Sequence, residues 1–428
     1  MNKRLNIGYI MQADAVDMST VSGPQLHVQA VIQGLQKRDH HVRLVAIQNG
    51  KPLWTDDLQT WQPGIYRFSK SRPFRLIERG VRSIQGRLRF PFFRFFDSYR
   101  FSEVCISACA GYDLLYERDG TISYGGLLAA RRLGIPLILE VNGDLVEEWR
   151  QLGVHWPRAQ QAVVHLLTRQ LYRSASHIVA VGETLRQRLI LRWGLNPAHI
   201  SVVTNGVDIE AFDTRNSGVS PGGASDSDIG SSPFIIFVGG FQPWHGVDHI
   251  INGFHRLVSV RPDARLVLVG DGPVWPDARC QVDRLNLQGR VIFAGRREHS
   301  EVINLLHKAD VAVIYHRGDA AQIVETPLKL FEYMAAGKAI VAPAVPNMQR
   351  ILSNEVNALL IPPDNPEALA NAFCRLLDQP ALRQSLGTSA QSDAFKKHSW
   401  NRAVLELENV FYRQLSCSTA LTSESDNA

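Results

Sequence analysis

The residues best suited to chemistry lie at positions 325–337, which read ETPLKLFEYMAAG. Thr326 is a favourable N-cap, Pro327 suits the first helical position and Gly337 suits a helix end, so a short helix is predicted. Lys329 then falls in the first turn, where a cation opposes the helix dipole. A bound anion, most simply a phosphate held by Lys329 and by the free N–H groups of that turn, would resolve this conflict.

Glu332 lies three residues after Lys329, on the same face of the predicted helix. Its carboxylate can accept hydrogen bonds from the hydroxyls of a ribose. Phosphate beside ribose indicates a nucleotide, and a nucleotide-sugar in particular. The competing interpretation is that Lys329 extends into solvent and forms only a surface ion pair with Glu332.

The composition is typical of a globular enzyme, with 45% hydrophobic and 20% charged residues, and 428 residues predict two domains. No apolar run approaches the ~18 residues that cross a bilayer, and we expect no signal peptide. The five cysteines have neither zinc-binding nor disulfide spacing. Their pattern favours a reducing cytoplasm.

Short apolar segments alternate with helical patterns through most of the chain. Two such series predict an α/β fold of two facing Rossmann-like domains, each with a parallel, doubly wound sheet, and with a ligand cleft between them. The predicted strands are residues 5–10, 42–47, 114–116, 136–141, 177–181 and 200–203 in the first domain, and 234–238, 265–269, 291–294, 311–315, 339–342 and 358–360 in the second.

The domain boundary is predicted from composition. Residues 213–233 are rich in Gly, Ser, Asp and Pro and read as a flexible linker between domains at 1–212 and 234–398. A long helix over residues 399–415 can pack back on the first domain, and residues 416–428 read as a disordered tail.

Glycines follow several predicted strands. Gly23 precedes a proline at the start of a helix, after the first strand. Gly240, Gly272 and Gly295 each belong to glycine motifs that end successive strands of the second domain. Glycines at neighbouring strand ends are predicted to clear space for a ligand at one edge of the sheet.

These residues resemble a known family, the family 4 retaining glycosyltransferases (group 1 glycosyl transferases) of the GT-B fold. The resemblance runs from about Asn6 to Leu415. It implies transfer of a sugar from a nucleotide-sugar, UDP- or GDP-linked, with retention at the anomeric carbon and with neither a metal nor a further cofactor. It is carried by the motifs NGVD at 205–208, GDGP at 270–273, PLKLFE at 327–332 and YMAAG at 333–337.

The resemblance also implies roles for single residues. It puts the ribose at Glu332, the diphosphate at Leu328 and Lys329, the nucleobase at Arg296, and the donor phosphate and acceptor near Gly23.

The chain departs from the family pattern at two cations. The usual phosphate-binding Arg and Lys align with Gly240 and His245, so we infer that Lys329 supplies the missing charge, while His245 can donate a hydrogen bond. Glu325 lies one position from the family's first paired acid, beside the transferred sugar. Lys329 and Glu325 are therefore the predicted catalytic residues.

The segment from Arg67 to Phe101 predicts the partner on the acceptor side. Up to Arg100 it holds ten Arg or Lys residues against two acids, interleaved with phenylalanines. This pattern favours peripheral docking on an anionic membrane that presents a lipid-linked acceptor. The alternatives are an ordinary helix with its Phe side chains in the core, and a nucleic-acid surface, which no accompanying motif supports.

The leading interpretation is a peripheral, cytoplasmic glycosyltransferase that builds a surface polysaccharide or glycolipid. The alternatives are a GT-B scaffold without catalysis, favoured by the missing cations, and a nucleotide-sugar epimerase, for which no acid–base groups are evident.

Overall fold

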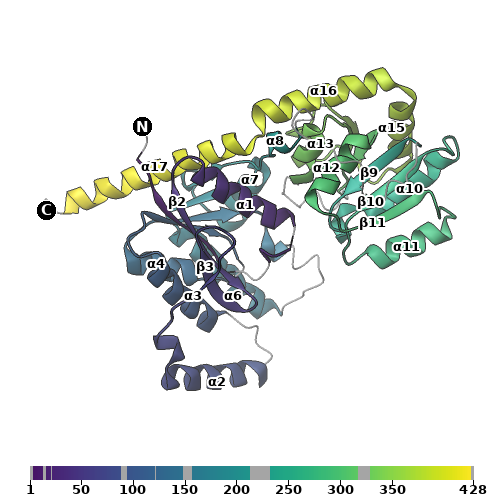
Figure 1. Ribbon diagram of the computed structural model, residues 1–428. Coiled ribbons are helices and arrows are strands. Elements are labelled where there is room, and N and C mark those ends of the chain that lie inside the picture. The colour runs from purple at the N-terminus through teal and green to yellow at the C-terminus, as the bar shows by residue number, and fades with distance from the viewer. Residues whose placement is uncertain are drawn as a thin grey trace. The chain divides into compact units, whose positions relative to one another are not determined.

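The computed structural model describes residues 3–12, 16–20, 22–87, 94–120, 122–147, 157–212, 232–316 and 328–425. They form two compact units (Figure 1): unit 1 comprises Met1–Thr204 and Ala403–Ala428, and unit 2 comprises Asn205–Arg402. The predicted boundary at 212 differs from this division, because Val207 and Phe212 pack in the core of unit 2.

Unit 1 contains an eight-stranded sheet in the order β4-β3-β2-β1-β5-β6-β7-β8. All six predicted strands are present and pair in parallel. They are β1 (Asn6–Met11), β2 (His41–Gln48), β5 (Leu114–Arg118), β6 (Leu137–Val141), β7 (His177–Ala180) and β8 (Ile200–Val202).

The sheet of unit 1 is not wholly parallel, contrary to the prediction. β3 (Lys51–Thr55) pairs antiparallel with β2, and β4 (Gln62–Pro63) pairs antiparallel with β3. The physical reason is the loop Asn49-Gly50, whose φ angles of 51° and 70° suit a two-residue hairpin.

Unit 1 also contains helices. They are α1 (Gly23–Gln36), α2 (Arg72–Arg87), α3 (Phe95–Ala108), α4 (Gly125–Leu133), α6 (Arg158–Ser174) and α7 (Glu183–Trp193), with the short turn η1 (Phe68–Lys70) before α2.

The last helix, α17 (Trp400–Ser425), returns to unit 1. Glu408 pairs with Arg38 and lies 3.0 Å from His40, and Phe411 meets Tyr116 edge to face. Residues 416–425, predicted to be disordered, continue this helix. No glycine or proline interrupts the sequence from Trp400 to Ser425.

Unit 2 contains a six-stranded sheet in the order β11-β10-β9-β12-β13-β14, parallel throughout, and all six of its strands were predicted. Apolar cores pack on both of its faces. The strands are β9 (Phe234–Val238), β10 (Arg265–Val269), β11 (Val291–Gly295), β12 (Val311–Val313), β13 (Ala339–Pro343) and β14 (Leu359–Ile361).

The helices of unit 2 that matter for the site are α10 (Val247–Val258), α12 (His299–Lys308) and α13 (Leu328–Ala335). Over the described ranges, no helix combines the length and apolar character that a membrane span requires.

Candidate functional site

The strand order of unit 2 reverses between β9 and β12. The chain winds outward from β9 through β10 to β11, and in the other direction from β12 through β13 to β14. Ligands of open α/β sheets bind at such a switch point, beyond the carboxyl ends of the strands. Gly239 follows β9 there, and Tyr315 and His316 follow β12.

The three glycine loops meet at this edge and hydrogen-bond to one another. The N–H of Gly239 donates to the carbonyl of Val269 (2.9 Å), and that of Gly270 to the carbonyl of Gly295 (2.8 Å). A Cβ at Gly270 would lie 2.1 Å from the carbonyl oxygen of Gly239, and one at Gly272 would lie 2.7 Å from the nitrogen of Phe241. The packing of the loops on one another is therefore sufficient to explain why positions 270 and 272 require glycine, whether or not a ligand binds there.

Lys329 lies against the first of these loops. A Cβ at Gly239 would be 2.0 Å from the Lys329 Nζ, and this amino group stands 5.0 Å from the centre of the Phe237 ring. α13 continues from Leu328 to Ala335, and Gly337, with φ of 65°, follows its end as predicted. The proposed cap and the predicted catalytic Glu325 lie outside the described residues.

Two histidines stand beside Lys329. The rings of His245 and His316 are nearly parallel, 12° apart, with centroids 5.5 Å from each other. Burial, and then the charge of Lys329, lowers the pKa of His316 to about 3 and holds the pKa of His245 well below its ordinary value. Both imidazoles are therefore neutral near pH 7.

The hydrogen bonding of the two rings differs. His245 Nδ1 lies 2.5 Å from the carbonyl oxygen of Gly240, which requires a proton on Nδ1 and leaves Nε2 of the neutral ring as an acceptor. His245 is thus poorly arranged to donate to an anion, unlike the expectation from sequence. His316 is 2% exposed, and neither of its ring nitrogens has a hydrogen-bond partner within the described structure. Its neutral ring holds one unused N–H.

Glu332 faces the start of α12. Its Oε1 lies 2.9 Å from His299 Nε2, and the Glu332 side chain is 16% exposed. The hydrogen bond with Glu332, followed by the charges of Glu332 and Asp208, raises the pKa of His299. The pairing fixes the position of one oxygen of Glu332.

The remaining predicted residues fall into two groups. Arg296 pairs with Asp271 through Nε and Oδ1 at 2.8 Å, so it lies at the same sheet edge with an exposed side chain. Gly23 opens α1 in unit 1, where Ser22 caps the helix by accepting from the N–H of Gln25. Unit 2 therefore brings together Gly240, His245, Gly272, Arg296, Leu328, Lys329 and Glu332 at or near one edge, and Gly23 belongs to the other unit.

Sequence reasoning missed His299 and His316. The available signal for His316 was its place just after a predicted strand, at the point where the strand order reverses. The signal for His299 was only its position shortly after the strand end at Gly295-Arg296. Across the described ranges, no group of three or more His, Cys, Asp or Glu side chains is arranged to hold a metal ion.

Comparison with known proteins adds two family matches. Residues 232–379 match the family model described as Glycosyl transferases group 1, and residues 21–211 match that described as Glycosyltransferase Family 4. A glycosyltransferase of Methanocaldococcus jannaschii is 24% identical over 70% of this chain and 75% of its own. The alpha-D-kanosaminyltransferase of Streptomyces kanamyceticus is 21% identical over 69% of this chain and 75% of its own.

Solved structures share the architecture. Anabaena HepE in complex with UDP superposes with a TM-score of 0.67 at 17% identity, covering 96% of this chain and 100% of its own. Sucrose-phosphate synthase from Thermosynechococcus elongatus gives a TM-score of 0.69 at 20% identity, covering 97% and 100%. At these identities the similarity establishes the fold.

Proposed function

Because this chain belongs to the family 4 (group 1) glycosyltransferases of the GT-B fold, we propose that it moves a sugar from a UDP- or GDP-sugar to a glycan or lipid-linked acceptor. The transfer retains the anomeric configuration and needs no metal ion. It serves the synthesis of a cell-surface polysaccharide or glycolipid on the cytoplasmic side of the membrane.

The observation that carries the proposal is the position of the Lys329 amino group, beside Gly239 and His316 at the switch point of the sheet. A diphosphate bound there would meet a positive charge and the unused N–H of His316. A buried polar group without a partner costs stability, which is a reason to expect a ligand that supplies the partner. Lys329 thereby replaces the cations absent at Gly240 and His245.

Glu332 supports binding of the donor ribose. His299 occupies Oε1, which leaves Oε2 to accept from a ribose hydroxyl. His299 acts as a positioning residue, because it holds the carboxylate in place. Arg296, at the exposed edge, is proposed to lie near the nucleobase.

The proposed chemistry depends on stabilising a leaving group. The bond between the anomeric carbon and the diphosphate oxygen breaks, and the acceptor hydroxyl oxygen bonds to the same face of that carbon. The hydroxyl proton passes to an oxygen of the leaving diphosphate. Lys329 and His316 stabilise the charge that develops there, and Glu325 is proposed to lie beside the transferred sugar.

The test is a binding screen of UDP-, GDP- and ADP-sugars by thermal shift and calorimetry, with Lys329→Ala and Glu332→Ala beside the wild type. UDP and UDP-glucose are the first probes, because Anabaena HepE was solved with both. A ligand at a hundred times its Kd should stabilise the native state by ~2.7 kcal/mol. Binding lost in both variants supports the proposal, and no binding of any nucleotide-sugar contradicts it.

Turnover completes the test. Product analysis by NMR should show the donor's anomeric configuration in the product, and added EDTA should leave the rate unchanged. An inverted product would contradict the retaining mechanism. A donor altered in the absence of acceptor would instead indicate an epimerase.

A further inference from the structure

Helix α2 exposes an apolar stripe that nothing in the described structure covers. Leu76, Ile77 and Ile84 are 64%, 62% and 58% exposed. Seven of the thirteen large hydrophobic side chains exposed in the described residues lie between Ile65 and Phe95, so the exposure is concentrated here. Figure 1 shows α2 set apart from the other elements of unit 1.

The spacing along α2 separates its apolar and basic residues. Ile77, Val81 and Ile84 repeat at intervals of four and three, which aligns them along one side of the helix. Arg72, Arg75 and Arg79 repeat at three and four and follow the other side. Leu76 lies about 100° around the helix from Ile77, between the two rows. This separation of aliphatic and basic faces at low overall hydrophobicity is typical of helices that lie in a membrane interface.

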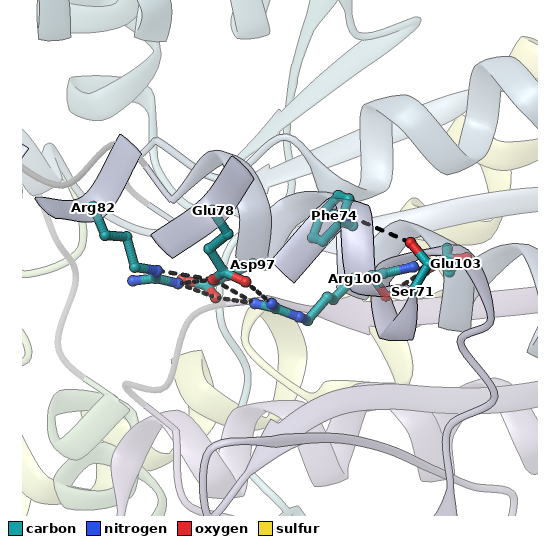
Figure 2. Close-up of polar contacts among 8 residues, drawn as sticks. Ser71, Phe74, Glu78, Arg82, Asp97, Arg100 and Glu103 are labelled. Atoms are coloured by element: carbon teal, nitrogen blue, oxygen red, sulfur yellow. Dashed lines mark hydrogen bonds and ion pairs between the residues drawn. The ribbon is translucent and has the colours of Figure 1, made fainter. Parts of the chain in front are cut away.

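A buried carboxylate fixes the rotation of α2 about its own axis. Glu78 points into unit 1, where Arg82 Nε donates to its Oε1 at 2.8 Å and Arg100 of α3 pairs with both of its oxygens (Figure 2). Burial alone would raise the pKa of Glu78, but hydrogen bonds from Arg100 and Arg82 hold it below its ordinary value. Phe74, 8% exposed, packs edge to face on Phe96 one turn away from Glu78.

This clamp uses both acids of the sequence between Arg67 and Arg100. Glu78 and Asp97 both pair with Arg82 and Arg100. Arg72, Arg75, Arg79 and Arg87 are exposed and form no ion pair with any described residue. The outer surface of α2 therefore carries charge of one sign.

We propose that α2 docks this enzyme on an anionic lipid bilayer, with Leu76, Ile77 and Ile84 inserted among the lipid headgroups and the free arginines neutralising them. The proposal deepens the proposed function by naming the surface on which a lipid-linked acceptor is met. The phenylalanines of the segment do not all follow one of the two sequence interpretations. Phe74, Phe96 and Phe101 are buried in unit 1, Phe68 and Phe95 are exposed, and Phe90, Phe92 and Phe93 lie outside the described residues.

Charge distinguishes a bilayer from the other possible occupants. A second copy would bring two cationic helices together, which is unfavourable. A nucleic acid would satisfy the arginines but give the aliphatic side chains no role. An anionic bilayer gives a role to both the arginines and the aliphatic side chains. The arginines lie within one helix diameter, ~10 Å, of the inserted face, and this distance is comparable to the Debye length at physiological salt, so they can interact with the lipid headgroups.

The experiment is flotation of the full-length protein with phosphatidylcholine vesicles that contain or lack 30% phosphatidylglycerol, without donor or acceptor. The wild type should float only with the anionic vesicles. Both the variant Leu76→Ser/Ile77→Ser/Ile84→Ser and the variant Arg72→Gln/Arg75→Gln/Arg79→Gln should lose at least tenfold in partition coefficient. The control Leu191→Ser/Val260→Ser/Val356→Ser removes aliphatic residues that are 84%, 64% and 57% exposed elsewhere and should bind as wild type.

The proposal is overturned if the wild type stays with the soluble fraction or binds neutral vesicles equally well, or if either α2 variant floats like the control. Ultracentrifugation that finds a dimer abolished by the aliphatic variant, or a gel shift with RNA in place of flotation, also overturns it. Nucleotide-sugar binding by both α2 variants should equal that of wild type. Failure of this proposal is therefore distinguishable from failure of the proposed function.

Discussion

The amino group of Lys329 occupies the space that a side chain at position 239 would need. A Cβ on Gly239 would lie 2.0 Å from Lys329 Nζ, and the glycine holds φ at 152°. A side chain at position 239 would thus compete with the lysine amine for this space. Gly239 and Lys329 therefore lie together in the proposed phosphate site, although 90 positions separate them in the chain.

The first expectation concerns Gly239→Ala. The new methyl group should displace the Lys329 amine, so donor affinity should fall as far as in a Lys329 variant. Gly289→Ala is the matched control, because Gly289 also has positive φ, at 71°, but an added Cβ there meets nothing within 4 Å. Calorimetry with UDP or the best donor measures both. Equal donor affinity in the two variants would contradict the steric relationship.

Lys329→Met should lower kcat/KM about 10²–10³-fold, since removing one preorganised donor to a developing negative charge costs ~3–4 kcal/mol. Lys396→Met removes an exposed lysine from the same unit and should have no effect. A second measurement is independent of activity. The charge of Lys329 contributes to the low pKa of His316 and His245, so NMR titration should find both pKa values raised in Lys329→Met.

The variant His316→Phe should change both the pH dependence of stability and the affinity for the donor, and the two effects can be measured separately. The folded-state pKa of His316 is about 3 against an ordinary 6.5, so as pH falls below 6.5 the unfolded state takes up a proton that the folded state refuses. From pH 7 to pH 5 the wild type should lose about 2 kcal/mol of stability at this position, and the phenylalanine variant should not. Denaturant unfolding at both pH values measures this.

The same variant should bind the donor at least tenfold more weakly, because the N–H offered to the phosphate is gone. His398→Phe is the control: burial, and then the charge of Lys397, lowers the pKa of His398 to about 4. The His398→Phe variant, like His316→Phe, should be spared the loss of stability that the wild type shows at this position between pH 7 and pH 5. Unlike His316→Phe, it should keep normal donor affinity. Normal donor binding by His316→Phe would show that its unused N–H has no role in the site.

His299→Asn tests the pairing with Glu332. The raised pKa of His299 means that its contribution to stability is complete below the unfolded value of 6.5 and is lost as pH rises through the higher folded-state pKa. The melting temperature of the wild type should therefore exceed that of the variant by more at pH 5.5 than at pH 8.5. A difference independent of pH would contradict the ion pair. Donor KM should rise in the variant, with kcat less affected.

Much of the fold was predictable because its signals are local. Apolar segments of three to six residues alternating with amphipathic helices indicated all twelve parallel strands. The antiparallel edge of β3 and β4 was missed even though its signal, Asn49-Gly50, is equally local. The end of α17 was misplaced because the polar composition of residues 416–428 was interpreted as disorder. The helix continues to Ser425 because no helix-breaking residue interrupts the sequence.

The sequence by itself determined that a cation sits in the first turn of α13 and a carboxylate one turn later, because helix geometry relates residues three apart wherever the helix lies. Tertiary structure alone decided their neighbours. His299 meets Glu332 across 33 positions, and His316 reaches Lys329 through the strand order of the sheet. The aliphatic face of α2 shows the same division: periodicity defines the stripe, but only the packing of Phe74 and Glu78 against α3 decides that it faces solvent.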